Sequence, residues 1–345
     1  MRQSNIEILR IISMLLVCLL HANFSALGIP DIIPNNTFSI SDFARLEYES
    51  IALVSVNVFV LISGYFSIQI NLKRIISLCF TILFWNVVLS AIAVFGGLVS
   101  FAHALKLLIP GLNDWFVQCY LLLVLVSPLC NSFIYRANQN QLRLYIFVFF
   151  IIEFIFGWII FWGYAYDSGY SVLHFIGMYL LGHYIRLSDV VKLRSARRML
   201  LYFIILVSST AAFIYISLSW TDSEYVREFL IQRFTAYTSP INVLGAILLF
   251  IIALKVNFQS QIINTVARSA FSVYLIHTFP PIFVLYKKLA VDLFAFDEML
   301  WPIMSLLFVS VVFIVCAILD QIRIFVLGIV RENIKSRMPV ALSDM

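Results

Sequence analysis

Long runs of apolar residues follow one another along the whole chain, and short polar segments separate them. A helix that crosses a lipid bilayer needs about 20 consecutive, mostly apolar residues. Ten stretches meet this requirement, so the predicted fold class is all-α, a polytopic membrane bundle of about ten transmembrane helices. The predicted helices span about residues 6–27, 51–70, 75–98, 113–132, 142–162, 168–186, 199–220, 236–254, 267–288 and 299–328.

The connections between these helices are short, which predicts a single membrane domain over residues 1–345. The longest, about residues 28–50, is expected to be an outer loop of roughly 23 residues, whereas a separate domain needs about 50. Residues 99–108 are predicted to form a short interfacial piece. The first apolar run resembles a signal-peptide core, but Glu7 lies where such a peptide has a basic leader, and no convincing cleavage site follows. We therefore expect this first helix to be retained.

The composition agrees with a membrane protein. Hydrophobic residues make up 62% of the chain and charged residues 12%, whereas a soluble domain is about half apolar and a quarter charged. All five cysteines lie inside apolar runs without the spacing of metal ligands, so we expect free thiols and no metal site. The cysteines are Cys18, Cys79, Cys119, Cys130 and Cys316.

Lys and Arg residues are distributed unevenly between alternate connections, and the more basic loops of a membrane protein usually face the cytoplasm. Because the number of predicted helices is even, both termini are predicted to be cytoplasmic. The basic residues are spread over many short segments, which argues against nucleic acid as a partner. In this orientation only six of the 23 Lys and Arg residues fall outside: Arg45, Lys106, Arg227, Arg233, Lys287 and Lys288.

The first predicted helix carries Arg10 and His21 on one face. They are eleven positions apart, so their side chains point the same way and lie about 16 Å apart along the axis. A cation at the inner rim can hold a phosphate-rich donor such as coenzyme A, and a histidine deeper in the bilayer can act as general base or nucleophile on its thioester. Alternatively, Arg10 extends to the lipid headgroups and His21 packs between helices, although ionisable groups at membrane depth are often functional.

Three further motifs follow this Arg-x10-His pattern in order along the chain. The whole set resembles the acyltransferase-3 family of integral membrane acyltransferases, of the sugar or polysaccharide O-acetyltransferase type. The resemblance extends over the first nine predicted helices. The three motifs are Phe59 to Tyr65, which ends in Ser63-Gly64-Tyr65; Trp115-Phe116 with Ser127-Pro128-Leu129 at the two ends of one helix; and Tyr274-Leu275-Ile276-His277.

The resemblance implies an activity and a location. Such proteins take an acyl group, commonly acetyl from cytoplasmic acetyl-CoA, and pass it to a sugar hydroxyl of a surface polysaccharide, a lipid-linked glycan or peptidoglycan. Acyl-CoA is then a donor substrate, with no bound cofactor, and the protein is expected in the lipid bilayer of a bacterial inner (plasma) membrane. By the same resemblance His21 is the catalytic histidine and Arg10 its basic partner; whether His21 is nucleophile or general base stays open.

Four residues are candidates for binding the acyl-CoA. Many family members carry Arg-x-x-Arg in the first cytoplasmic loop, whereas here Lys73 and Arg74 are adjacent. Both can still pair with phosphate, or they serve only to fix the topology. Ser63 and Tyr65 either line the donor channel or pack between helices around the intervening glycine.

Four more residues are candidates for lining the site. His277 precedes Pro280 by three positions, and the proline is expected to kink that helix. Asn57 and Trp115 belong to or adjoin the motifs above. Glu153 is an acid in the middle of a predicted helix and needs a partner; it either orients His21 or is structural. The alternative for His277 is a hydrogen-bonded histidine between helices.

Other polar and aromatic residues are predicted to be structural. His103, His174 and His183 are expected to have no catalytic role, and Asp320 is expected to pair with Arg323 on one helix. An aromatic group near one end of the fifth and sixth helices is typical of an interfacial belt, although such rings also stack on sugars. The group comprises Trp158, Trp162, Tyr164, Tyr166 and Tyr170.

Two other classes of protein fit a bundle of this kind. A glycan transporter or flippase is expected to show repeated halves with paired broken helices, and neither is evident. A glycan polymerase is expected to have a sizeable basic outer loop. Neither class explains a basic residue and a histidine aligned on one helix, so the sequence favours a membrane acyltransferase.

Overall fold

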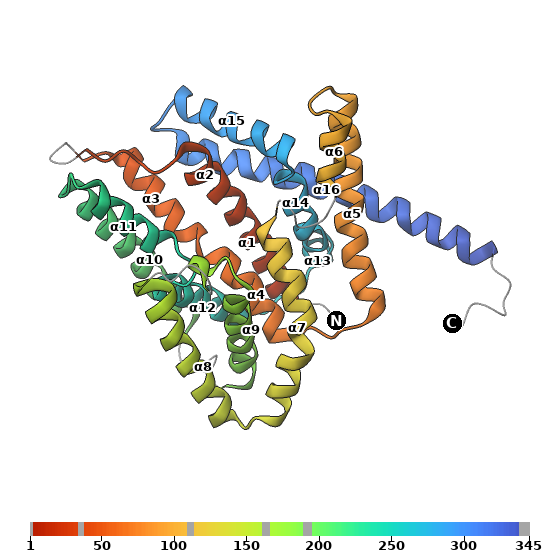
Figure 1. The fold of residues 1–345 in the computed structure, drawn as a ribbon, viewed down its shortest axis with the longest axis horizontal. Coiled ribbons are helices and arrows are strands. Elements are labelled where there is room, and N and C mark those ends of the chain that lie inside the picture. Colours follow the sequence, from red (N-terminus) through yellow and green to blue (C-terminus); the bar gives the residue numbers. More distant parts are fainter. Residues whose placement is uncertain (1–2, 34–37, 109–113, 161–165, 189–194, 338–345) are drawn as a thin grey trace.

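The computed structural model describes residues 3–33, 38–108, 114–160, 166–188 and 195–337, and its described residues contain helices without any strand (Figure 1). The chain is therefore all-α, as its apolar pattern predicts. The helices are α1 (Ser4–Ala22), α2 (Phe24–Leu27), α3 (Ile40–Ala52), α4 (Val54–Phe66), α5 (Leu72–Phe95), α6 (Phe101–Leu107), α7 (Trp115–Arg136), α8 (Gln139–Glu153), α9 (Val172–Leu187), α10 (Ala196–Ser219), α11 (Glu224–Thr235), α12 (Pro240–Lys255), α13 (Gln261–Val266), α14 (Ala270–His277), α15 (Pro280–Phe296) and α16 (Trp301–Arg337).

Within the described ranges, eight helical segments are long and apolar enough to cross a membrane, and a ninth is formed if one bent pair counts as a single span. The bent pair is Gln261–His277 with Pro280–Phe296, at an angle of 89°. The break lies at the proline that the sequence predicts as a kink, because proline cannot continue the hydrogen-bonded ladder of the preceding helix. The remaining predicted segment, 168–186, corresponds to α9, whose 16 residues are short for a span.

The prediction of an outer loop over residues 28–50 is wrong for its second half, which is helical. α3 begins at Ile40 and continues through Leu53, which keeps helical dihedral angles, into α4. Ile40–Phe66 is therefore one span of 27 residues. The charged residues of α3 hide this helix from a reading of hydropathy, yet Arg45 and Glu49 are almost completely buried.

α4 and α9 lie side by side at the centre of the bundle, in closer contact than any other pair of helices. Gly64 on α4 lies against the backbone of Tyr179, and Gly182 on α9 lies against the backbone of Leu61. A Cβ atom at either glycine would collide with a carbonyl group, so only glycine allows this approach. The glycine of the Ser63-Gly64-Tyr65 motif thus packs two helices together.

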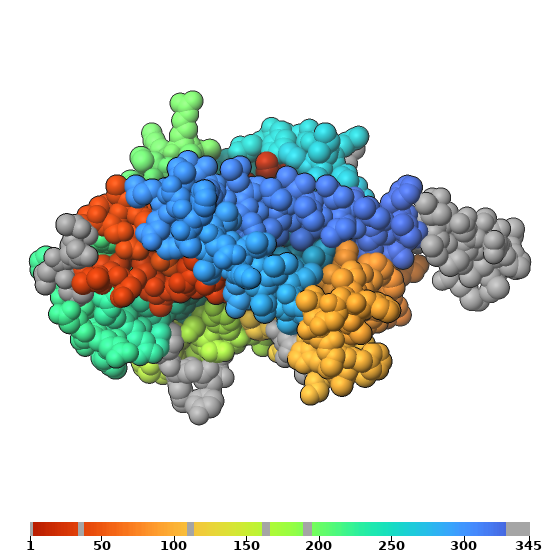
Figure 2. All heavy atoms as spheres, turned by 90° about the horizontal axis from the view of Figure 1, so that it is seen from above, coloured from red at the N-terminus to blue at the C-terminus, as the bar shows by residue number. Residues whose placement is uncertain are grey.

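α16 forms one outer face of the molecule. Figure 2 shows it crossing the bundle from the side of α3 towards α5 and α6, and Figure 1 shows the ribbon of α16 continuing past α5. Its Asp320 accepts hydrogen bonds from Arg323, at 2.7 Å, and from the indole of Trp85 on α5, at 3.2 Å. The predicted Asp320–Arg323 pair is therefore present, and it also ties α5 to the bundle.

Candidate active site

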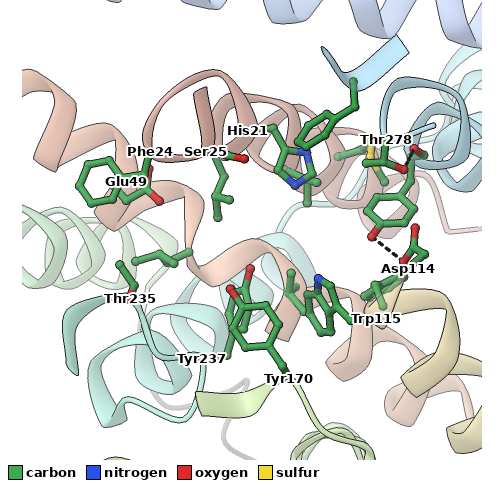
Figure 3. Close-up of a pocket in the computed structure, with 18 of the residues that line it drawn as sticks. His21, Phe24, Ser25, Glu49, Asp114, Trp115, Tyr170, Thr235, Tyr237 and Thr278 are labelled. Carbon is green, nitrogen blue, oxygen red and sulfur yellow. Dashed lines mark hydrogen bonds between the residues drawn. The ribbon is translucent and has the colours of Figure 1, made fainter. Parts of the chain in front are cut away.

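A cavity of about 660 Å³ lies where the ends of several helices meet (Figure 3). Its wall comes from α1 to α4, the start of α7, the end of α11, α14, the start of α15, and the segments just before α9 and α12. In Figure 3, His21 lies across the cavity from Trp115, Tyr170 and Tyr237. Two predicted site residues, His21 and Trp115, thus line one cavity although 94 positions separate them in the chain.

His21 stands near the end of α1, just before the helix breaks. Asn23 leaves helical geometry, and its side-chain amide donates to the Arg45 carbonyl at 2.7 Å and to Glu49 Oε2 at 2.9 Å. The Arg45 guanidinium in turn donates to Asn23 Oδ1 and to the Gly28 carbonyl. These bonds anchor the chain on α3 two residues beyond His21 and so fix where α1 presents its histidine.

His277 holds the other side of His21. His21 Nδ1 lies 2.9 Å from His277 Nε2, and His277 Nδ1 lies 2.7 Å from the Val273 carbonyl. A carbonyl oxygen can only accept, so the proton of neutral His277 is on Nδ1 and its Nε2 is an acceptor. His21 must therefore donate from Nδ1, which leaves Nε2 of neutral His21 with a free lone pair. The ring of Phe283 packs edge-on against His21, with centroids 5.1 Å apart.

The bend between α14 and α15 makes this pairing possible. His277 is the last residue of α14, and α15 leaves at 89° from Pro280. His277 itself is completely buried. It does not line the cavity but supports His21 from behind, so the candidate role of His277 becomes one of positioning.

Opposite His21, an aromatic wall is built around the first turn of α7. Trp115 stacks on Tyr237, with centroids 5.7 Å apart and planes at 27°, and its centroid lies 4.4 Å from that of Tyr170. Of the predicted aromatic group, Tyr170 therefore reaches the cavity, whereas Tyr166 lies outside its lining. Trp158 instead donates to the Arg233 carbonyl, at 3.0 Å. Trp162 and Tyr164 lie outside the described residues.

Two carboxyl groups face the cavity from different sides, one from Glu49 and one from Asp114 (Figure 3). Asp114 Oδ1 caps α7 by accepting from the Val117 amide at 3.0 Å, and it also accepts from the Tyr274 hydroxyl at 2.8 Å. Burial raises the pKa of Asp114, while these two hydrogen bonds favour its carboxylate and oppose that shift.

Glu153 and Asn57 do not line the cavity. Both Glu153 oxygens lie 3.1 Å from His174 Nδ1, and Asn57 Oδ1 lies 2.8 Å from His174 Nε2. All three side chains are completely buried. The hypothesis that Glu153 orients His21 is therefore wrong, since its partner is His174. Asn57 Nδ2 also donates to the Tyr237 carbonyl at 3.0 Å, so this group supports the aromatic wall from behind.

The donor-binding candidates lie away from the cavity wall. Arg10 is 31% exposed and pairs with Glu7 at 2.9 Å, a partner that the sequence interpretation missed. Lys73 and Arg74 are exposed in the first turn of α5, whose cap is Asn71. Arg10 lies eleven positions before His21 on α1, and α5 contributes no described residue to the cavity wall.

Ser63 and Tyr65 have partners inside the bundle. The Ser63 hydroxyl donates to the Phe59 carbonyl at 3.0 Å and lies 3.5 Å from the Tyr120 hydroxyl. The Tyr65 ring packs edge-on against Phe250, with centroids 5.3 Å apart, and its carbonyl accepts from Arg186. Neither residue lines the cavity that contains His21.

The sequence interpretation missed Glu49, Asn23, Tyr237 and a site role for Tyr274. Glu49 was assigned to a loop, although its spacing of four from Arg45 is helical. Asn23 could have been noticed as a helix-breaking polar residue directly after His21. Within the described ranges, no group of three or more His, Cys, Asp or Glu side chains could hold a metal ion.

Comparison with known families gives one match over most of the chain. A family model described as an acyltransferase domain, of the acyltransferase-3 type, matches residues 3–320. No curated protein and no solved structure matches significantly. The matched range includes every residue of the cavity wall.

Proposed function

The chain belongs to the acyltransferase-3 family of membrane acyltransferases, and on this premise we propose that it moves an acetyl group from cytoplasmic acetyl-CoA to a sugar hydroxyl. The acceptor is part of a surface polysaccharide or a lipid-linked glycan, and the membrane is a bacterial inner membrane. The observation that carries the proposal is His21 in the cavity wall, with a free lone pair on Nε2 that the hydrogen bond to His277 maintains.

The proposed reaction is direct transfer with His21 as general base. Nε2 takes the proton from the acceptor hydroxyl while the hydroxyl oxygen bonds to the thioester carbonyl carbon. The carbon–sulfur bond then breaks, and the proton passes from His21 to the departing thiolate, which leaves as free coenzyme A. His277 accepts from Nδ1 throughout and so stabilises the imidazolium that forms on His21.

The two substrates approach from opposite sides in this proposal. Arg10, Lys73 and Arg74 bind the phosphates of acyl-CoA at the cytoplasmic side, with Ser63 and Tyr65 along the path of its pantetheine arm. Arg10 and His21 share one face of α1 at a separation of about 16 Å along the axis, which an extended pantetheine arm can bridge. The acceptor enters the cavity from the outer side, where the aromatic wall provides apolar ring faces and a few polar groups to orient it.

The test is acetate transfer in inside-out membrane vesicles, which expose the cytoplasmic face to added radiolabelled acetyl-CoA. Wild type is compared with His21→Ala and with His103→Ala, a matched control on the exposed helix α6. We expect base-labile label on glycan with wild type and the control, and none above background with His21→Ala at equal protein level. Label that His21→Ala leaves unchanged removes His21 from the chemistry.

Two other outcomes would revise the proposal in different ways. Acetate bound covalently to His21 in acceptor-free vesicles would replace the general base by a nucleophile. No label from any acyl-CoA with wild type would favour a glycan transporter.

A further inference from the structure

In its described part, the cavity wall combines acidic and aromatic side chains, and His21 is the only basic side chain there. Among its described lining residues are the carboxyl groups of Glu49 and Asp114, and no Lys or Arg side chain. A negatively charged group that enters this cavity therefore finds two acids and, in the described wall, no cation.

Two basic residues, Lys287 and Arg45, contact residues near the cavity, but neither is among its described lining residues. The Lys287 ammonium lies 4.9 Å from the centroid of Phe283, and it is the Phe283 ring that lines the cavity. Arg45 is buried behind Asn23, where its guanidinium donates to Asn23 and Gly28 and packs 5.2 Å from the centroid of Phe294. Arg45 is therefore committed to the scaffold that positions α1.

The chemistry of this wall favours hydroxyl groups. Burying an anion beside carboxylates costs several kcal/mol when no cation pairs with it. Carboxylate oxygens are strong acceptors for hydroxyl protons, and the stacked rings of Trp115 and Tyr237 offer apolar faces between them. Glu49 and Asp114 face the cavity from different sides, so each can accept a hydroxyl proton from a sugar bound there.

We propose that the sugar unit that receives the acyl group is uncharged, and that Glu49 and Asp114 bind its hydroxyls and exclude uronic, sialic and phosphorylated sugars. The inference rests on the proposed acyl transfer to a sugar, and it concerns only the unit inside the cavity. Other units of the same glycan remain free to carry charge outside it.

The first experiment identifies the acetylated sugar. Vesicles from the cells that produce the protein are supplied with labelled acetyl-CoA, the labelled glycan is cleaved without base, and mass spectrometry locates the acetate. Acetate on a neutral or N-acetylated sugar is expected. Acetate on an anionic sugar would overturn the charge inference while leaving the acyltransferase proposal intact. Glycan without any label would instead overturn the proposed function, and the inference with it.

The second experiment uses nearly isosteric variants. Glu49→Gln and Asp114→Asn keep a hydrogen-bonding side chain of nearly the same shape but replace the carboxyl group by an amide, and we expect each to raise the KM for the acceptor roughly 10-fold. The KM for acetyl-CoA should stay unchanged, whereas a merely structural defect would lower the active fraction and leave both KM values alone. Asp31→Asn is the matched control, because Asp31 is 97% exposed and lies outside the cavity wall.

Lys287→Gln tests the alternative that the acceptor is anionic and pairs with Lys287. If the acceptor is uncharged, this variant should keep its acceptor KM within about twofold of wild type, since the Lys287 ammonium packs on the Phe283 ring and Lys287 is not among the described lining residues. A large rise in acceptor KM with Lys287→Gln, together with unchanged values for Glu49→Gln and Asp114→Asn, would show that an anionic acceptor pairs with Lys287.

Discussion

Two buried histidine clusters lie on either side of the cavity's aromatic wall, and they differ in how completely their nitrogens are used. His174 has two side-chain partners, Glu153 on one ring nitrogen and Asn57 on the other, and Asn57 also donates to the Tyr237 carbonyl. Among the described residues, His21 has one hydrogen-bond partner, His277, and its ring lines the cavity. A histidine with both nitrogens satisfied can support structure, whereas one with a free lone pair beside a cavity can move a proton.

In the His174 cluster, both ring nitrogens have hydrogen-bond partners and the charges balance. The Tyr237 carbonyl fixes the Asn57 amide as a donor, so Asn57 Oδ1 must accept from His174 Nε2. His174 Nδ1 and Glu153 then share one proton, whichever of them holds it, and the pair carries no net charge. This arrangement allows an acid to be completely buried in the bundle, and it provides a firm base for Tyr237.

The comparison predicts the largest loss of activity at His21. His21→Ala should lower kcat by about 10²–10⁴-fold, the usual contribution of a general base. Thermal stability should change little, because the side chain borders an existing cavity. Added imidazole should restore part of the activity by occupying the space left in the wall. The measurement is initial rate at equal protein level, with and without imidazole; full activity of the unrescued variant would abolish the distinction between the two clusters.

His277 should have the next largest effect on activity. His277→Ala leaves Nδ1 of His21 without its acceptor, so we expect kcat to fall by roughly 10–100-fold, as for other residues that orient a functional histidine. His277→Gln keeps an acceptor oxygen and should recover part of the loss. Both variants should leave the two KM values close to wild type. Equal activities for the Ala and Gln variants would mean that His277 packs against His21 without orienting it.

The His174 cluster should affect stability before activity. His174→Ala leaves Glu153 without its partner in the interior, which should cost about 3–5 kcal/mol of folding free energy. The thermal unfolding midpoint of the detergent-solubilised protein should fall by several degrees, while kcat per folded molecule stays within a few-fold of wild type. A large loss of kcat at an unchanged midpoint would place His174 in the chemistry instead.

The difference between the clusters could not be predicted from sequence, although much of the fold could. Apolar run length predicts the spans well, because a bilayer demands length and hydrophobicity from each helix separately. It fails at α3, where Arg45 and Glu49 are buried in contact with Asn23, a residue between α1 and α2. A sequence read one helix at a time does not contain those contacts.

The site follows the same rule. The spacing of Arg10 and His21 marks His21 because both lie on one helix. The partners of His21 and Glu153 lie 256 and 21 positions away, and only the folded bundle decides between them. Of the two alternatives for Glu153, the one in which it orients His21 is therefore wrong. The structural role expected for His174 stays a prediction, and its partner Glu153 was not expected.

A substitution of a third histidine, His183, should have the smallest effect on activity and stability. His183 on α9 is only partly buried, does not line the cavity, and has its Nδ1 3.0 Å from the Ser67 hydroxyl. His183 therefore neither lines the cavity, as His21 does, nor has completely buried partners on both ring nitrogens, as His174 does. One neutral, partly exposed hydrogen bond contributes about 1 kcal/mol, so His183→Gln should change kcat by less than about twofold and the unfolding midpoint by a few degrees at most. The two assays used for His174→Ala measure both quantities. A loss of activity as large as that of His277→Ala would mean that depth and partner count do not decide which histidines are functional in this bundle.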